Sequence, residues 1–163
     1  MTAVRLDYAG DRLSALVLVP DAGRSIAEVE KQLTPLLIKQ LTERMSKEKV
    51  SLALPKFEFR WRSELGEPLQ ALGMKTPFTA KADFSGIDGA RGLYISKVIH
   101  EAFIKVHEEG SEAAAATAVV MRRGMPQPPA EVTVDRPFLF LIQDRQTGAI
   151  LFLARVRNPN SKG

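Results

Sequence analysis

The alternation of apolar and polar residues predicts a β-hairpin near each end of the chain. Val4, Leu6 and Tyr8 alternate with polar residues, and a short turn then leads into the apolar run 13–19. Near the C-terminus, the apolar run 138–142 is joined to a second strand, 150–156, by the polar segment 144–148. Because these apolar runs are far shorter than a bilayer span, we expect them to be buried strands.

Helix signals follow the first hairpin. The sequence Ser25-Ile26-Ala27-Glu28 has the spacing of a capping box, and Thr34-Pro35 opens a second helix that carries several leucines. A third, short helix is expected around 68–72, with Gly73 just past its end, and residues 74–90 are expected to form a loop. We expect these helices to pack on the surface of the strands.

Three further segments have the two-residue period of strands. Residues 50–54 and 57–61 alternate over short stretches and are expected to be half-buried, and the β pattern returns over 93–106. In this last strand, His100 and Ile104 lie on the same face. The mixture of strands and short helices predicts an α+β protein.

The segment 108–129, EEGSEAAAATAVVMRRGMPQPP, is a long link between two predicted strands. Its alanines alone favour a helix, but a link of this length is usually a lid, a binding loop or disordered. Read with a period of two, it has one face that is small at first and apolar later: Ser111, Ala113, Ala115, Thr117, Val119 and Met121. The segment therefore suits a loop in one state and a strand with a buried side in another, with Gly110 as the hinge.

Two motifs in this order resemble the serpin family, and specifically bacterial-type inhibitory serpins. The first is similar to the hinge of a serpin reactive-centre loop: Glu108, Glu109, Gly110, Ser111, Glu112, Ala113, Ala114, Ala115, Ala116 and Thr117. The second, residues 132–142, is similar to the C-terminal serpin signature. Weaker similarities include 52–57, 82–87 and 95–100, so the resemblance covers the whole chain.

The resemblance implies that residues 1–163 are the C-terminal part of a serpin domain. The expected fold has mixed and antiparallel sheets, a few short helices and an exposed reactive-centre loop over about 108–130. The N-terminal helices and most strands of the large sheet are absent from these residues. The resemblance therefore leaves three origins open: one piece of a longer serpin, one of two chains, or a truncated gene product.

The function implied by the resemblance is suicide inhibition of a serine protease, with loop cleavage followed by insertion into the large sheet. Arg122-Arg123 favours a trypsin-like target and a reactive bond between Arg123 and Gly124, although the usual loop length places the bond between Gly124 and Met125. Arg122 and Met121 are lesser candidates.

His100 is expected to be structural, at the point where the large sheet opens. The expected partners are the protease and the N-terminal part of the serpin, without which inhibition is not expected. A non-inhibitory serpin-like binding fragment is the alternative.

Composition excludes several other classes. There are no cysteines, and the net charge of +4 comes from lysines and arginines interleaved with acidic residues, which argues against a nucleic-acid or membrane partner. The motifs of phosphate loops, zinc proteases and nucleophile elbows do not occur, so we expect no enzyme, metal or cofactor. No signal peptide is visible in the first residues. The resemblance favours an extracellular location, and a cytoplasmic one stays open.

Overall fold

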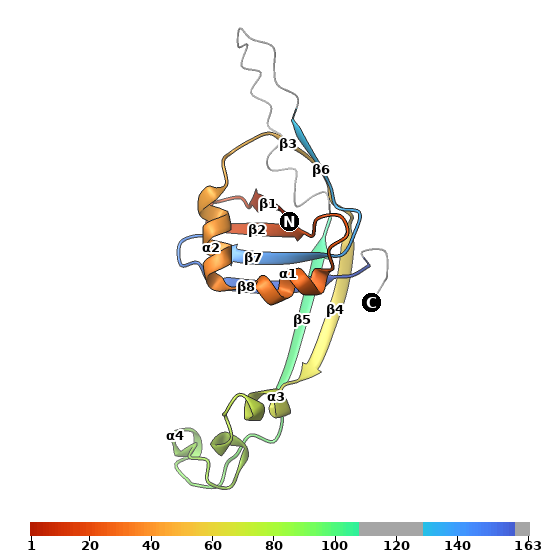
Figure 1. Ribbon diagram of the computed structural model, residues 1–163. Coiled ribbons are helices and arrows are strands. Elements are labelled where there is room, and N and C mark those ends of the chain that lie inside the picture. The colour runs from red at the N-terminus through yellow and green to blue at the C-terminus, as the bar shows by residue number, and fades with distance from the viewer. Residues whose placement is uncertain (108–128, 159–163) are drawn as a thin grey trace. The chain divides into compact units, whose positions relative to one another are not determined.

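A computed structural model describes residues 1–107 and 129–158 of the chain (Figure 1). The described residues form two compact units. The first joins residues 1–57 to the residues from Val106 onward, and the second contains Glu58–Lys105. Each unit is described by itself below.

The first unit is built on a four-stranded antiparallel sheet with the order β1-β2-β7-β8. These strands are β1 (Thr2–Asp7), β2 (Leu13–Val19), β7 (Phe138–Asp144) and β8 (Ile150–Val156). β1–β2 and β7–β8 are the two hairpins predicted from the sequence, and β2 and β7 join them at the centre of the sheet. The central strands are buried, as their apolar runs predict: Leu16, Leu18, Leu139 and Leu141 are each at most 2% exposed.

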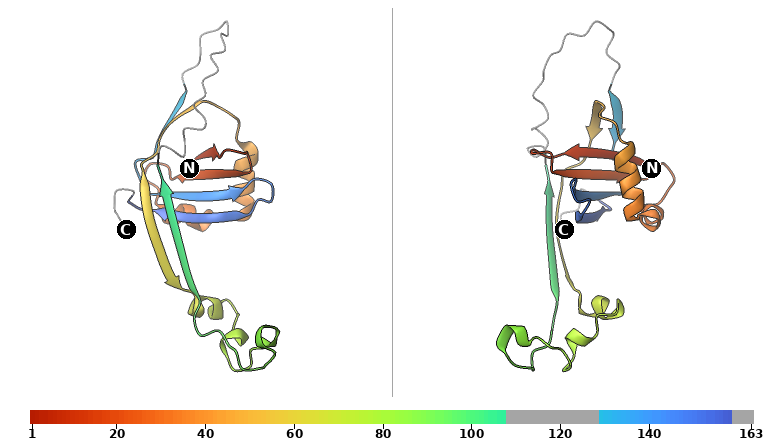
Figure 2. Two further views of the ribbon diagram at one scale, coloured as in Figure 1. Left: turned by 180° about the vertical axis from the view of Figure 1, so that it is seen from behind. Right: turned by 90° about the vertical axis from the view of Figure 1, so that its left-hand side faces the viewer.

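Two helices cover one face of this sheet, α1 (Ile26–Gln32) and α2 (Pro35–Arg44). Figure 1 shows them in front of the strands, and the view from behind in Figure 2 shows them on the far side. Val29 of α1 and Ile38 of α2 pack on the four central leucines. The predicted capping box is present, because the Ser25 hydroxyl accepts a hydrogen bond from the Glu28 amide at 3.3 Å and the Glu28 carboxylate accepts one from the Ser25 amide.

The opposite face of the sheet carries an aromatic core. Phe138 and Phe140 are at most 1% exposed, and Phe57 packs edge-on against both, with ring centroids 5.7 and 5.5 Å apart. Burial of each ring stabilises the fold by about 1.5–3 kcal/mol. Phe57, the last residue of the first of this unit's two segments, is thereby fixed to β7 of the C-terminal hairpin.

The first unit also contains a short parallel pair that the sequence did not predict. β3 (Val50–Ala53) lies beside β6 (Ala130–Thr133), and the Val134 amide donates to the Ala53 carbonyl at 2.9 Å. β3 was expected to be half-buried, but only Leu52 is partly covered and the rest of the strand is exposed. The four residues of β6 carry too little alternation to indicate a strand, and their pairing is with a strand far away in the sequence.

The second unit contains β4 (Phe57–Glu64) except its first residue and β5 (Ile99–Val106) except its last. The two strands pair as a two-stranded sheet, and their arrows in Figure 1 run in opposite directions. Between them lie α3 (Gly66–Ala71), the 3₁₀ turn η1 (Thr76–Phe78) and α4 (Ser85–Asp88). Gly73 follows α3 with φ of +103°, as its predicted position after a helix requires.

Four expectations are corrected here. α3 begins two residues before Pro68, and the expected loop 74–90 contains η1 and α4. The strand expected from Leu93 begins only at Ile99, because the Ile95 amide donates to the Pro77 carbonyl at 2.8 Å and so binds a loop. The half-burial expected along 57–61 also fails at Trp61, which is 50% exposed.

Asp144 fixes the tips of the two hairpins of the first unit to each other. Its carboxylate accepts hydrogen bonds from the Thr147 amide at 3.0 Å, the Gln146 amide at 2.9 Å and the Arg12 guanidinium at 2.9 Å. These bonds, that from Thr147 foremost, hold the pKa of Asp144 below its usual range, because they favour the charged form. The residue is only 6% exposed.

We therefore expect acid to weaken this junction. A carboxyl group whose pKa is lower in the folded state contributes stability above its unfolded pKa of about 3.9, and this contribution is lost as the pH falls through the folded pKa. The Asp144→Asn variant should be less stable than the parent at pH 7, and the difference should shrink below about pH 4. Urea unfolding followed by circular dichroism at both pH values measures this, with Glu43→Gln as the exposed control. Equal stability of parent and Asp144→Asn at pH 7 would contradict the prediction.

Candidate functional site

The segment with the strongest functional motifs lies outside the described residues. These motifs are the hinge, residues 108–117, and the candidate reactive bond, residues 121–125. Both assignments stay predictions. The structure does describe the strands that lead into and out of this segment, because β5 ends at Val106 and β6 begins at Ala130.

The entry strand β5 has one charged face, which it shares with β4. Arg60 forms an ion pair with Glu101, and its guanidinium lies over the Phe103 ring, 5.3 Å from the centroid. Lys105 lies 3.4 Å from the Glu58 carboxylate. The hydrogen bond from Arg60 lowers the pKa of Glu101, because it stabilises the carboxylate. These contacts between side chains of neighbouring strands fix the register of β5 on β4.

The other face of the pair is aromatic and apolar. The His100 ring lies edge-on to the Trp61 ring, with centroids 5.8 Å apart, and Ile104 is 8% exposed. His100 thus lies on the face that the sequence predicted, but it is exposed to solvent. Its structural role where a sheet opens stays a prediction. Sequence reasoning did not find the partnership with Trp61, because it depends on the pairing of two strands that lie far apart along the chain.

The outer edge of β5 is the part of this strand that is able to bind another strand. Within residues 1–107 and 129–158, β5 pairs with β4 alone, so the backbone groups of its other edge meet no further strand. Such an edge is a template for another strand. The chain therefore enters the segment 108–128 directly from a strand that is able to accept a partner.

The exit strand β6 is held at both ends. The Ala130 amide donates to the Lys49 carbonyl at 3.3 Å, and Val134, which follows the strand, is 4% exposed. Asp135 and Arg136 form an ion pair at 2.8 Å, and the hydrogen bond from Arg136 lowers the pKa of Asp135. The residues that follow the segment 108–128 are thus tied to β3.

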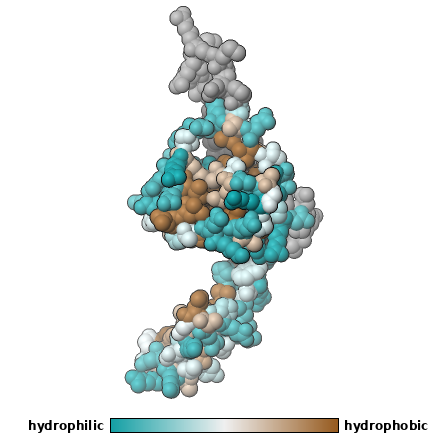
Figure 3. Space-filling model, viewed as in Figure 1, coloured by the Kyte–Doolittle hydropathy of each residue, from teal (hydrophilic) through white to brown (hydrophobic). Residues whose placement is uncertain are grey.

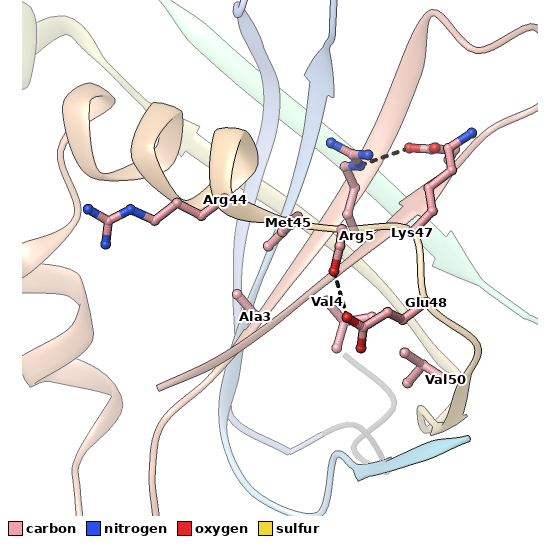
Figure 4. A pocket seen from close by; sticks show the side chains of 10 residues that line it. Ala3, Val4, Arg5, Arg44, Met45, Lys47, Glu48 and Val50 are labelled. Carbon is pink, nitrogen blue, oxygen red and sulfur yellow. Dashed lines mark hydrogen bonds and ion pairs between the residues drawn. The ribbon is translucent and has the colours of Figure 1, made fainter. Parts of the chain in front are cut away.

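A hollow of about 500 Å³ opens beside β1, lined by that strand and by the segment from Arg44 to Val50 (Figure 4). Four of its polar side chains are paired with one another: Arg5 lies 3.1 Å from Asp7, and the Ser46 hydroxyl donates to Glu48 at 2.6 Å. Neither histidine lines it. Across the described part of the chain, no three histidine or acidic residues are grouped so as to hold a metal ion.

Comparison with known proteins identifies the family. A family model described as serpin (serine protease inhibitor) matches residues 1–159. The chain belongs to the serpin family. It is 42% identical over 162 residues to a serpin-like protein of Thermococcus kodakarensis, a match that covers 98% of this chain and 38% of that protein. It is 39% identical to the human leukocyte elastase inhibitor, a match that covers 96% of this chain and 43% of the inhibitor.

The fold agrees with this assignment. A solved structure of thyroxine-binding globulin in complex with thyroxine superimposes with a TM-score of 0.80 at 31% identity, covering 98% of this chain and 41% of that chain. The α+β fold expected from the serpin resemblance is therefore confirmed as a partial serpin fold. The chain spans less than half the length of these relatives. A search of the described helices finds none that is both long and apolar enough to cross a membrane.

Proposed function

We propose that this chain is the part of a serine protease inhibitor that carries the reactive loop. The observation that carries the proposal is the open edge of β5 directly before a hinge motif whose odd-numbered side chains are small, such as Ala113 and Ala115. Small side chains are buried at little entropic cost when a loop becomes a strand. Family membership and the relation to a leukocyte elastase inhibitor support the same conclusion.

In the proposed reaction, the protease's serine oxygen attacks the carbonyl carbon of Arg123, and the amide of Gly124 leaves with a proton. The acyl-enzyme is then trapped when the freed hinge adds to the large sheet as a strand. About a dozen new backbone hydrogen bonds at roughly 0.5–1.5 kcal/mol each, with burial of Val119 and Met121, provide on the order of 10 kcal/mol. The chain supplies the bond that is cleaved and the hinge segment that inserts as a strand, and the protease supplies the catalytic groups.

The proposal requires serpin sequence beyond these residues to complete the large sheet. We call the completed serpin the polypeptide in which residues 1–163 follow the part of the Thermococcus kodakarensis relative that lies outside the match. This protein should inhibit trypsin at a stoichiometry near one, as measured by residual amidase activity. A completed serpin that leaves trypsin fully active would refute the proposed function.

We expect the 163-residue chain by itself to aggregate and to be unable to trap a protease. Figure 3 shows apolar residues at the surface of both units, and Phe103 and Leu153 are 45% and 55% exposed. Open strand edges and exposed apolar residues together promote association. Size-exclusion chromatography and denaturing electrophoresis after mixing with trypsin measure both properties. A soluble monomer that forms a complex with trypsin stable in detergent would contradict the prediction.

A further inference from the structure

The connection from α4 to β5, residues 89–98, is the longest stretch of the second unit that contains no helix or strand. Every residue from Gly86 to Tyr94 is exposed, and in Figure 1 α4 and the stretch after it lie beyond the ends of β4 and β5. In the described part of the chain, the backbone of residues 91–94 makes no hydrogen bond. Exposed loops of this kind are where proteases cut folded proteins, because the backbone is drawn into the enzyme without breaking local structure.

Arg91 lies at the centre of this stretch and points a cation into solvent. Its side chain is 82% exposed, and its guanidinium lies 3.4 Å from the Asp83 carboxylate. That carboxylate already accepts hydrogen bonds from the Ser85 hydroxyl at 2.6 Å and the Ser85 amide at 3.1 Å. Because an ion pair between two exposed side chains contributes little, Arg91 is available to a specificity pocket that contains a carboxylate.

The residue after Arg91 leaves open space around the peptide bond. A Cβ atom built on Gly92 would meet no atom within 4 Å. Arg91-Gly92 is also the same dipeptide as Arg123-Gly124, where we propose the reactive bond. A protease that selects Arg123 by its charge therefore finds the same side chain at Arg91.

Two other exposed basic residues in loops show what makes Arg91 different. At the bond after Arg24, the Ser25 amide donates to the Glu28 carboxylate at 3.3 Å and so belongs to the start of α1. Lys81 is followed by Ala82, which is only 7% exposed. A protease that cut at these bonds would have to open a helix cap or expose a core residue, whereas the bond after Arg91 requires neither.

We propose that Arg91–Gly92 is a second bond that a trypsin-like protease cleaves, and that the protein acts there as a substrate. The serine oxygen attacks the carbonyl carbon of Arg91, the C–N bond breaks, and the Gly92 amine leaves with a proton. Water then hydrolyses the acyl-enzyme to the Arg91 carboxylate and frees the serine.

The acyl-enzyme at Arg91 is not trapped, because too little chain precedes the bond. Only residues 89–91 separate the end of α4 from it, a reach of about 10 Å when extended. These residues cannot form the inserted strand that the hinge is proposed to supply after cleavage at Arg123. A protease that attacks Arg91 thus remains active.

Cleavage at Arg91 breaks the covalent connection between β4 and β5. The ion pairs of Arg60 with Glu101 and of Lys105 with Glu58 still join the two strands. We therefore expect the two fragments to stay together until the protein is denatured. The inference rests on the proposed function only in its choice of a trypsin-like protease.

The test uses the completed serpin with Arg122→Ala and Arg123→Ala, so that the reactive loop offers trypsin no arginine. The fragment that begins at Gly92 is followed over time by mass spectrometry after denaturation. Adding Arg91→Gln should slow its appearance by about 10²-fold or more, because the specificity pocket loses its ion pair, and Arg91→Lys should keep it. Arg24→Gln is the matched control and should be cut at Gly92 like the parent.

A fragment that begins at Gly92, is lost in Arg91→Gln and returns in Arg91→Lys supports the inference. Its absence from the parent, or an unchanged rate in Arg91→Gln, overturns it. The same digestion of the completed serpin with its own reactive loop separates the two proposals. Cleavage before Gly92 by trypsin that is never inhibited would leave the inference standing and refute the proposed function, and inhibition by a protein that resists this cleavage would do the reverse.

Discussion

Replacing Arg123 with Ala in the completed serpin is expected to slow association with trypsin by on the order of 10²-fold or more. The physical reason is the loss of an ion pair that the arginine forms with a carboxylate inside the desolvated specificity pocket of a trypsin-like protease. The rate is measured from progress curves at several inhibitor concentrations. Arg122→Ala is the matched control, because it removes the same charge one residue away.

A larger effect of Arg122→Ala than of Arg123→Ala would move the reactive bond by one residue. Equal and small effects of both substitutions would contradict a trypsin-like target and favour Met121, a side chain that suits chymotrypsin-like or elastase-like pockets. Elastase is therefore the second protease to assay.

Replacing Ala115 with Arg in the completed serpin is expected to turn the inhibitor into a substrate. Ala115 belongs to the face of the hinge that we propose is buried when the loop inserts, and burial of an unpaired charge costs several kcal/mol. Insertion of the loop should then be slower than hydrolysis of the acyl-enzyme, so that trypsin cleaves the loop and is released. The number of inhibitor molecules consumed for each trypsin molecule inactivated should rise steeply.

The matched control is Ala114→Arg, which places the same side chain on the opposite face of the hinge, with Glu112 and Arg122. This variant should keep a stoichiometry close to that of the parent. If Ala114→Arg loses inhibition and Ala115→Arg keeps it, the even-numbered face is the one buried, and the proposed register is wrong.

The fold was predictable from the sequence where local pattern and burial agree. The apolar runs of β2 and β7 indicate buried strands by themselves, and the capping box at Ser25 marks the start of α1 through contacts within four residues. The prediction failed where pairing partners lie far apart along the chain. β6 is a strand because it pairs in parallel with β3. The region from Leu93 begins as a loop because the Ile95 amide donates to the Pro77 carbonyl.

The candidate site likewise has features that the sequence alone indicates and features that depend on strand pairing. The motif at 108–117 is a property of consecutive residues, so the sequence alone indicates a hinge. The open edge of β5, the contact of His100 with Trp61 and the exposure of β8 depend on which strands are neighbours. Sequence alternation gives the faces of a strand, but it does not tell whether a face or an edge is covered.

The most direct test of the central claim is the mass of the peptide released from the complex with trypsin. The completed serpin is mixed with trypsin, the complex is isolated by denaturing electrophoresis, and the C-terminal peptide is identified by mass spectrometry after alkaline denaturation. We predict a covalent complex and a released peptide that begins at Gly124. A peptide that begins at Met125 or Arg122 would keep the mechanism but move the bond. The absence of a covalent complex, with cleavage only outside residues 121–125, would contradict the proposal that this chain carries the reactive loop of a serine protease inhibitor.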